Sequence, residues 1–425
     1  SMTKRERDEF ATLIYYPAAI VAEKKAQGAA DKDWYLVQLH RLVEVCRSVA
    51  SKYTRSKVRK ALPAYFDYII DELINMDRDD FDKEAYYGEI FASIIDLGRA
   101  EPFIVAITDL IKRLAVDSLH IVGDIFDRGE NPDKIMELLI NHHNADVQWG
   151  NHDIQWMGAH MGNEASILSV VELSLKYGNE DLLEESYGIS LRKLSVYAAE
   201  YMDDDPRFLP AGADPAAAGE EARRIARMRK AAFLMQLKAE GHIIERRPEY
   251  GMEGRNILRL IDYGRGTFCG EKLNDASFPG VDPSDPLRFS QEEREVIEGL
   301  KRSFRSHISF LMRRGSAYKI CNNNLIFHGC VPLEPDGSYM SFCGHAGKDL
   351  LDYCERNVRR AYAAFGRGGE DAEALDFFFY LWCGRCSPLY GREKITTFER
   401  LYIDDPAFHK EQDNSYYIYC KQKEY

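Results

Sequence analysis

The sequence predicts an α+β protein in which long helical segments surround a few short strands. Apolar residues recur at three- and four-residue spacing through most of the chain, as in amphipathic helices. Two short apolar runs, Leu119–Val122 and Val147–Trp149, interrupt this pattern, and each ends in a glycine turn rich in polar side chains. Because such a turn delivers polar groups to the edge of a sheet, we expect a functional site there.

Composition and charge exclude several classes of protein. The 425 residues are 45% hydrophobic and 29% charged, as in a soluble globular protein. The net charge of −13 argues against general nucleic-acid binding, but a phosphorylated small substrate remains compatible because bound cations invert the local field. No apolar run approaches the roughly 18 residues of a membrane helix. Nine scattered cysteines indicate reduced thiols and a cytoplasmic location.

The order of these patterns along the chain predicts five parts. Residues 4–115 form a mainly helical N-terminal region, and residues 116–170 form the first part of the core, where strands and a helix alternate. Residues 171–317 form a helical insertion. Residues 318–335 supply a strand pair to the core, and residues 336–425 form a mainly helical C-terminal region.

Within these parts, local signals predict individual elements. Helices are expected over 35–53, 64–74, 86–97, 347–364 and 373–382.

The core elements have clearer signals. A helix over Pro132–His142 fits between the two polar turns. Strands are expected at Ala317–Cys321 and Leu325–Phe327, because Asn322-Asn323-Asn324 supplies a turn that tolerates positive φ.

The two polar turns are Gly123-Asp124-Ile125-Phe126-Asp127-Arg128-Gly129 and Gly150-Asn151-His152-Asp153. Asp124 and Asn151, 27 residues apart, offer oxygen ligands, and the Asp124 carboxylate can bridge two divalent cations. His152 is positioned to protonate a leaving group and Asp127 to orient it, while the planar fork of Arg128 suits phosphate oxygens. Together, the two turns are typical of the core of a dinuclear metallophosphoesterase.

A third candidate ligand is His328, which follows the strand Leu325–Phe327 and precedes a glycine, as in the earlier turns. We therefore expect the strands at 119–122, 146–149 and 325–327 to belong to one sheet. Asp124, Asn151 and His328 would then cluster at its edge.

Other polar segments are weaker candidates for functional residues. A basic run beside Tyr53 is interpreted first as a solvated helix face, with a phosphate site of substrate or effector as the alternative: Lys52, Arg55, Lys57, Arg59 and Lys60. Gly344-His345 is interpreted as a loop that enters a helix. Trp382-Cys383-Gly384-Arg385-Cys386 mimics a redox motif but lacks the βαβ context of one.

Longer blocks carry a family resemblance: 11–17, 51–63, 120–129, 147–158, 380–384, 387–389 and 397–400. With them the chain resembles class III fructose-1,6-bisphosphatase, the bacterial type of the calcineurin-like metallophosphoesterase superfamily. The resemblance implies a β-sandwich flanked by helices. It also implies hydrolysis of the 1-phosphate of fructose 1,6-bisphosphate in gluconeogenesis, with two Mn²⁺ ions in an intact site.

The chain departs from this family at two blocks, an early Asp-x-His-Gly and a final Gly-His, neither of which is found where the family has it. We therefore expect an incomplete form, cut at both ends, that holds at most one Mn²⁺ and catalyses slowly. A Ser/Thr protein phosphatase is one alternative, but it would not explain the 175 residues between Asp153 and His328. A non-catalytic fragment whose helices mediate oligomerisation is the other, and homo-oligomerisation remains open.

Overall fold

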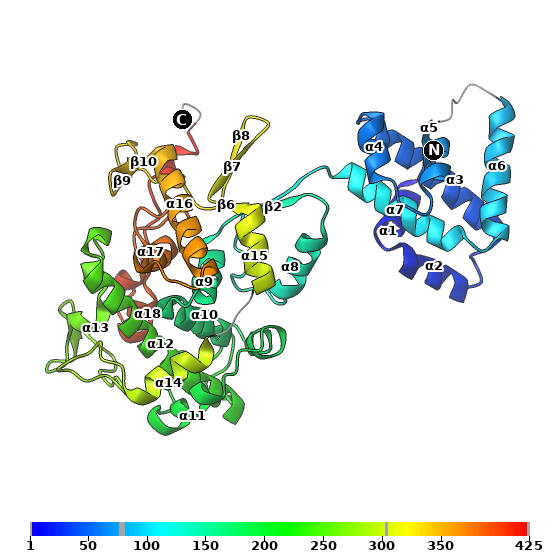
Figure 1. Cartoon of the computed structure of the whole chain (residues 1–425). Coiled ribbons are helices and arrows are strands. Elements are labelled where there is room, and N and C mark those ends of the chain that lie inside the picture. Colours follow the sequence, from blue (N-terminus) through cyan, green and yellow to red (C-terminus); the bar gives the residue numbers. More distant parts are fainter. Residues whose placement is uncertain (1, 76–80, 302–304, 423–425) are drawn as a thin grey trace. The chain divides into compact units, whose positions relative to one another are not determined.

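A computed structural model describes residues 2–75, 81–301 and 305–422, and contacts between its elements separate residues 1–119 from residues 120–425 (Figure 1). The boundary between these two units falls inside the first strand, Leu119–Ile121. Each unit has its own buried core. The finer division into five parts remains a prediction.

The first unit is helical, as its apolar spacing predicts. Its helices are α1 (Lys4–Tyr15), α2 (Pro17–Ala26), α3 (Lys32–Ala50), α4 (Arg55–Ala61), α5 (Asp67–Asn75), α6 (Phe81–Asp96) and α7 (Ala100–Ala115). The Thr3 and Asp31 side chains accept hydrogen bonds from backbone N–H groups in the first turns of α1 and α3, and so fix where those helices start. Helix α3 packs on α5 and α7, and Leu39, Leu42 and Ile107 are fully buried in this core.

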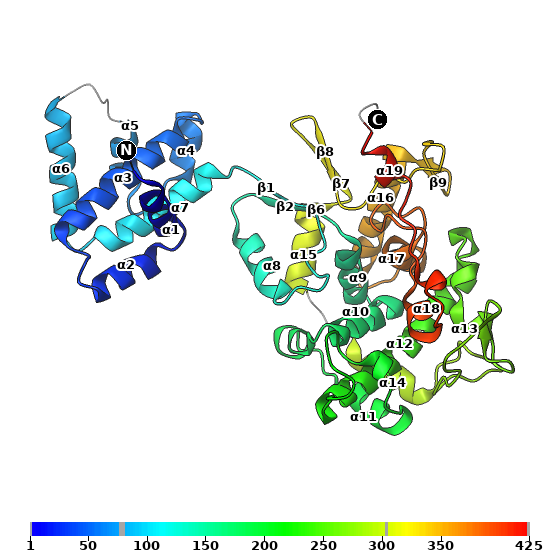
Figure 2. The ribbon, with the colours of Figure 1, turned by 180° about the vertical axis from the view of Figure 1, so that it is seen from behind.

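The second unit carries the strands and most of the helices. Its helices are α8 (Pro132–Asn141), α9 (Asn151–His160), α10 (Glu164–Lys176), α11 (Arg192–Tyr201), α12 (Glu220–Arg246), α13 (Ile257–Leu260), α14 (Gln291–Leu300), α15 (Arg305–Arg314), α16 (Gly347–Gly366), α17 (Ala372–Cys383), α18 (Thr397–Tyr402) and α19 (Tyr416–Tyr419). Helix α9 packs against α10 and α17, and the long α12 packs against α10 and α11 (Figure 2). These helices form the scaffold behind the polar turns. Within the described residues, no helix has the length and apolar character needed to cross a bilayer.

The strands form small separate sheets. They are β1 (Leu119–Ile121), β2 (Ala145–Gln148), β3 (Ile261–Asp262), β4 (Thr267–Phe268), β5 (Glu271–Lys272), β6 (Gly315–Ser316), β7 (Tyr318–Cys321), β8 (Asn324–Phe327), β9 (Ser341–Phe342) and β10 (His345–Ala346). One sheet has the order β1-β2-β6, with β2 and β6 parallel. The mixture of helices and small sheets agrees with the predicted α+β class.

One expectation about the sheet is wrong. The strand before His328 was expected in the same sheet as β1 and β2, but β8 pairs with β7 in a hairpin of its own, and β6 is the third strand of the first sheet. Asn322 and Asn323 both have positive φ, 50° and 63°, which is the two-residue turn geometry that holds neighbouring strands together. The tight turn therefore determines the partner of β8.

A buried carboxylate ties the loop before α12 to that helix. Asp205 is 6% exposed, and its carboxylate lies 2.5 Å from Arg207 Nη2 and 2.9 Å from Lys230 Nζ. Burial alone would raise the pKa of Asp205, but the two cations outweigh it and lower the pKa to about 2.

This lowered pKa predicts how acid affects stability. The group stabilises the fold above its unfolded pKa, and that contribution is lost as the pH falls toward 2. The advantage of the wild type over Asp205→Asn in free energy of unfolding should shrink by about 1–2 kcal/mol below pH 4. Denaturant titrations at pH 6, 4 and 3 measure it. The exposed Asp203→Asn control should show no such trend, and a constant margin for Asp205→Asn would contradict the prediction.

Candidate active site

The Asp153 carboxylate joins the two polar turns. It accepts hydrogen bonds from the backbone N–H groups of Gly150 in its own turn and of Asp124 and Ile125 in the other, each at 2.9 Å. The side chain is fully buried. Burial raises the pKa of Asp153 to about 6, although the backbone donor from Gly150 opposes this rise. The first turn is thereby held to the start of α9.

Glycine is required where the turns touch. A Cβ on Gly150 would lie 2.1 Å from Asp124 Oδ1, and one on Gly123 would lie 2.4 Å from the backbone nitrogen of Gly150. Gly123 also has a φ of +80°, which L side chains rarely adopt. Asp124 follows with a φ of 54°, a left-handed conformation that aspartate tolerates. The glycines therefore let the Asp124 carboxylate lie against the second turn.

Asp124 and His328 face each other across the site. Asp124 Oδ2 lies 3.2 Å from His328 Nε2, and Asp124 Oδ1 accepts the backbone N–H of His152 at 3.2 Å. His328 Nδ1 lies 2.5 Å from the carbonyl oxygen of Val122. Burial would lower the pKa of His328, but the Asp124 carboxylate outweighs it and raises the pKa.

A second carboxylate–imidazole pair lies in the same turns. Asp127 Oδ1 is 2.9 Å from His152 Nε2 and 3.2 Å from Arg128 Nε. Burial opposes ionisation of Asp127, yet His152 and Arg128 together lower its pKa. Asp127 in turn raises the pKa of Arg128, whose guanidinium lies 5.6 Å from the centre of the Tyr177 ring. The arrangement keeps an ionised carboxylate beside an imidazole.

Trp382 of helix α17 contacts the second turn. Asn151 donates from its side-chain nitrogen to the carbonyl of Trp382 at 3.3 Å, so the side-chain oxygen remains the ligand atom. The Trp382 ring lies edge-on to His152, with 4.8 Å between ring centres. Asn151 and His152 are therefore held by a residue more than two hundred positions away.

The donor set fits a divalent metal ion. Ligand atoms of Asp124, Asp127 and His152 all lie within 4.8 Å of one another. In His328 the Nδ1 faces a backbone carbonyl while Nε2 faces a carboxylate, which is the usual orientation of a metal-bound histidine. Asp124 belongs to the group with Asp127 and His152 and also faces His328. It is therefore the central candidate for a metal ligand.

The basic run belongs to the first unit, whereas the polar turns and His328 belong to the second. Its members are on or near α4 in the first unit, and all five are exposed: Lys52, Arg55, Lys57, Arg59 and Lys60. Arg55 lies 3.4 Å from Asp71 and Lys57 lies 2.5 Å from Asp117. Its role in phosphate binding remains a prediction.

Comparison with known proteins places the chain in a family. A family model described as Firmicute fructose-1,6-bisphosphatase matches residues 1–425. The chain belongs to this family. It is 43% identical over 440 residues to "Fructose-1,6-bisphosphatase class 3" of Clostridium tetani, covering 100% of this chain and 66% of that protein. The protein of the same name from Bacteroides fragilis is 45% identical over 437 residues, covering 99% of this chain and 66% of that protein. No solved structure matches.

The chain thus spans about two thirds of the length of these curated fructose-1,6-bisphosphatases. Within that span it contains both polar turns and His328. The motifs that predicted a metallophosphoesterase therefore lie within the residues that match the family model, 1–425.

Two supporting residues of this fructose-1,6-bisphosphatase family member had no role in the sequence-based interpretation. Asp153 was noted only as the end of its turn, although an acidic residue at the third position of a helix after a glycine is a recognisable capping signal. Trp382 was noted only as part of a redox-like motif. No spacing in the sequence connects it to Asn151, because the contact depends on how α17 packs on α9.

Removing the Asp153 carboxylate should separate the two turns. Asp153→Ala leaves three backbone N–H groups without their acceptor, so the free energy of unfolding should fall by about 3 kcal/mol or more. Denaturant unfolding at pH 7 measures this loss, and the exposed Asp203→Ala is the matched control, expected to change stability by less than about 0.5 kcal/mol. Equal stability of the two variants would show that the turns are held by other contacts.

Proposed function

We propose that this protein hydrolyses the 1-phosphate of fructose 1,6-bisphosphate in a reaction that requires a divalent metal ion. The observation that carries the proposal is the convergence of two carboxylate–imidazole pairs from three separate segments: Asp124 with His328, and Asp127 with His152. The names of the relatives support the choice of substrate. Gluconeogenesis in the cytoplasm is the setting in which we expect the reaction.

In this proposal Asp124, Asn151 and His328 hold the metal. Carboxylate, amide and imidazole ligands together suit Mn²⁺, the ion that the family resemblance implies. When bound, such an ion lowers the pKa of water and polarises a phosphoryl oxygen. The fixed orientation of His328 by the Val122 carbonyl, and of Asn151 by the Trp382 carbonyl, supports these assignments.

The other three residues act on the phosphate and the leaving group. Protonated His152 donates its proton to the sugar alkoxide as the ester bond breaks. The Asp127 carboxylate, 2.9 Å away, orients the imidazole. Arg128 binds phosphate oxygens and balances the negative charge that develops on them. Proton donation requires His152 to be held in a fixed orientation. The Trp382 ring, which packs against the His152 ring, supplies this support.

We further propose that the β1-β2-β6 sheet and the β7–β8 hairpin are parts of a calcineurin-like β-sandwich. The support is local, because polar ligands follow strand ends in β1, β2 and β8, as that fold requires.

The substrate assignment can be tested directly. Purified protein with Mn²⁺ should release phosphate from fructose 1,6-bisphosphate and leave fructose 6-phosphate, which should itself resist hydrolysis. A phosphoserine peptide serves as the alternative substrate. Preference for the peptide would replace the proposal with a protein phosphatase.

Loss of the His152 imidazole should slow the chemical step. His152→Ala should lower kcat for fructose 1,6-bisphosphate by about 10²–10⁴-fold while Mn²⁺ affinity changes little, because the side chain acts on the leaving group. Steady-state kinetics and calorimetric Mn²⁺ titration measure the two quantities. The exposed His143→Ala is the control, and unchanged turnover in His152→Ala would assign leaving-group protonation to another group.

Loss of the central carboxylate should instead affect the metal. Asp124→Asn should weaken Mn²⁺ binding by at least about 10²-fold, because it removes a charged ligand. This loss should exceed the effect of removing a residue that only hydrogen-bonds to a ligand. Calorimetric titration of the apoprotein measures the affinity without substrate. Asp349→Asn, outside the site, should bind Mn²⁺ as the wild type does. Equal affinity in Asp124→Asn would exclude this carboxylate as a ligand.

A further inference from the structure

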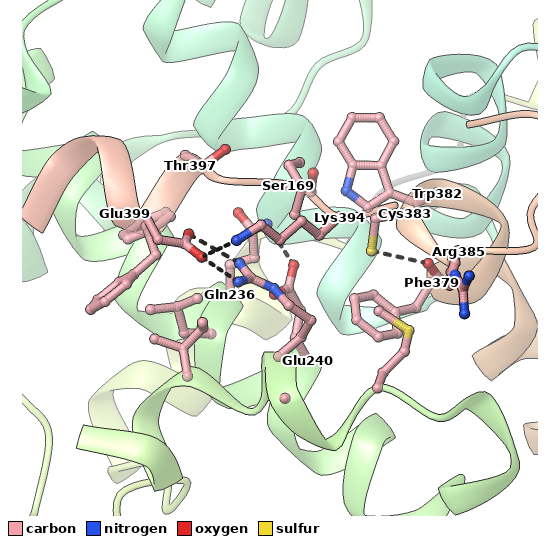
Figure 3. A pocket seen from close by; sticks show the side chains of 18 of the residues that line it. Ser169, Gln236, Glu240, Phe379, Trp382, Cys383, Arg385, Lys394, Thr397 and Glu399 are labelled. Atoms are coloured by element: carbon pink, nitrogen blue, oxygen red, sulfur yellow. Dashed lines mark hydrogen bonds and ion pairs between the residues drawn. The ribbon is translucent and has the colours of Figure 1, made fainter. Parts of the chain in front are cut away.

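A second cavity lies among the helices of the second unit, apart from the polar turns. It has a volume of about 470 Å³ and is lined by residues of α10, α12, α17 and α18 and of the segments around Arg255 and Lys394 (Figure 3). This volume is within the range of small-molecule sites. Among the residues that line it are none of the proposed metal ligands, nor Asp127, Arg128 or His152. The cavity is therefore a separate candidate site.

Aromatic side chains supply much of its wall. They come from helices and strands far apart in the sequence: Phe233, Tyr250, Phe268, Phe379, Trp382, Phe398 and Phe408. Such walls favour an apolar ligand body, and ring faces also attract organic cations.

Most charges at the cavity are already paired. Glu399 is 2.5 Å from Arg255 and 3.8 Å from Lys394. Arg385 is paired with Glu393 at 2.5 Å. Figure 3 shows the Glu399 group on one side of the cavity and Cys383 on the other.

Glu240 differs from these acids. Within the described part of the chain it has no ion pair, and its carboxylate accepts one hydrogen bond, from Gln236 Nε2 at 2.7 Å. A carboxylate has room for about four donors. Burial raises the pKa of Glu240 to about 7, against the opposing effect of Gln236. Beside it, Gln236 Oε1 is buried and has no hydrogen-bond partner among the described residues. At this cavity, then, the Gln236 oxygen has no donor and the Glu240 carboxylate has only one among the described residues.

We propose that this cavity binds a small organic amine, whose ammonium group pairs with Glu240 and whose apolar body packs against the aromatic walls. An ammonium carries three donors, enough to serve both the carboxylate and the neighbouring Gln236 oxygen. Glu240 is partly buried, and removing a carboxylate from water without an ionic partner is costly, so a cation that supplies the partner recovers part of that cost on binding.

Anionic ligands fit this cavity poorly. A sugar bisphosphate would meet the carboxylates of Glu240 and Glu399, while Arg255 and Arg385 are already paired. Lys176 is the remaining cation of the lining, and its ammonium lies 5.3 Å from the centre of the Tyr177 ring. The charges that line this cavity therefore favour a cationic ligand over a phosphate.

The test uses three probes of one shape and different charge: 4-phenylbenzylamine, 4-phenylbenzyl alcohol and 4-phenylbenzoate. Saturation-transfer NMR and calorimetry at pH 8 measure binding to the wild-type protein. The amine should bind at least about tenfold more tightly than the alcohol, and the carboxylate should bind most weakly. An amine that binds no better than the alcohol overturns the proposal.

A variant pair locates the binding. Glu240→Gln should reduce amine affinity at least about tenfold and leave alcohol affinity unchanged. Glu245→Gln, on the same helix but outside the cavity lining, should bind the amine as the wild type does. Thermal unfolding of each variant checks that the fold is retained, which we expect because Glu240→Gln removes a buried charge. Unchanged amine affinity in folded Glu240→Gln also overturns the proposal. Since no readout uses phosphatase activity, the result is independent of the proposed function.

Discussion

The candidate site depends on one buried carboxylate. Asp153 joins backbone N–H groups of two turns that are separated in the sequence by a whole helix, α8. With the turns joined, Gly123 and Gly150 come close enough that neither can carry a Cβ. That approach brings the Asp124 carboxylate to the backbone N–H of His152. The contact between Asp124 and the turn that carries His152 thus depends on a buried carboxylate to which the proposed function gives no catalytic role.

Helix α17 provides the second constraint, because Trp382 contacts the second turn through both its backbone and its ring. Its carbonyl orients the Asn151 amide, and its indole packs on His152. The same indole forms part of the wall of the cavity beside Glu240. The helical scaffold therefore has two effects in one place. It fixes two polar side chains of the site, and it encloses a cavity in which Glu240 has no ion pair within the described part of the chain.

Local electrostatics differ from the overall charge of the protein. The chain has a net charge of −13, yet Arg128 of the first turn, His152 of the second turn and His328 after β8 lie beside the carboxylates of Asp127 and Asp124. Asp127 remains ionised beside His152 because the two cations around it outweigh its burial. At the other pair, the Asp124 carboxylate raises the pKa of His328. A metal ion at Asp124 would therefore compete with the proton on His328.

Sequence alone determined the elements whose signals are local. Apolar spacing predicted α3, α8, α16 and α17 to within a few residues, and the asparagine turn predicted the β7–β8 hairpin, since helix and turn geometry depend on neighbouring residues. The paired carboxylates and imidazoles were also predicted as one site. Tertiary structure alone decided that β6 and not β8 joins β1 and β2, that Asp153 clamps the turns, and that Trp382 supports Asn151. Those contacts join distant segments, and their partners are chosen by burial and packing, which no short pattern records.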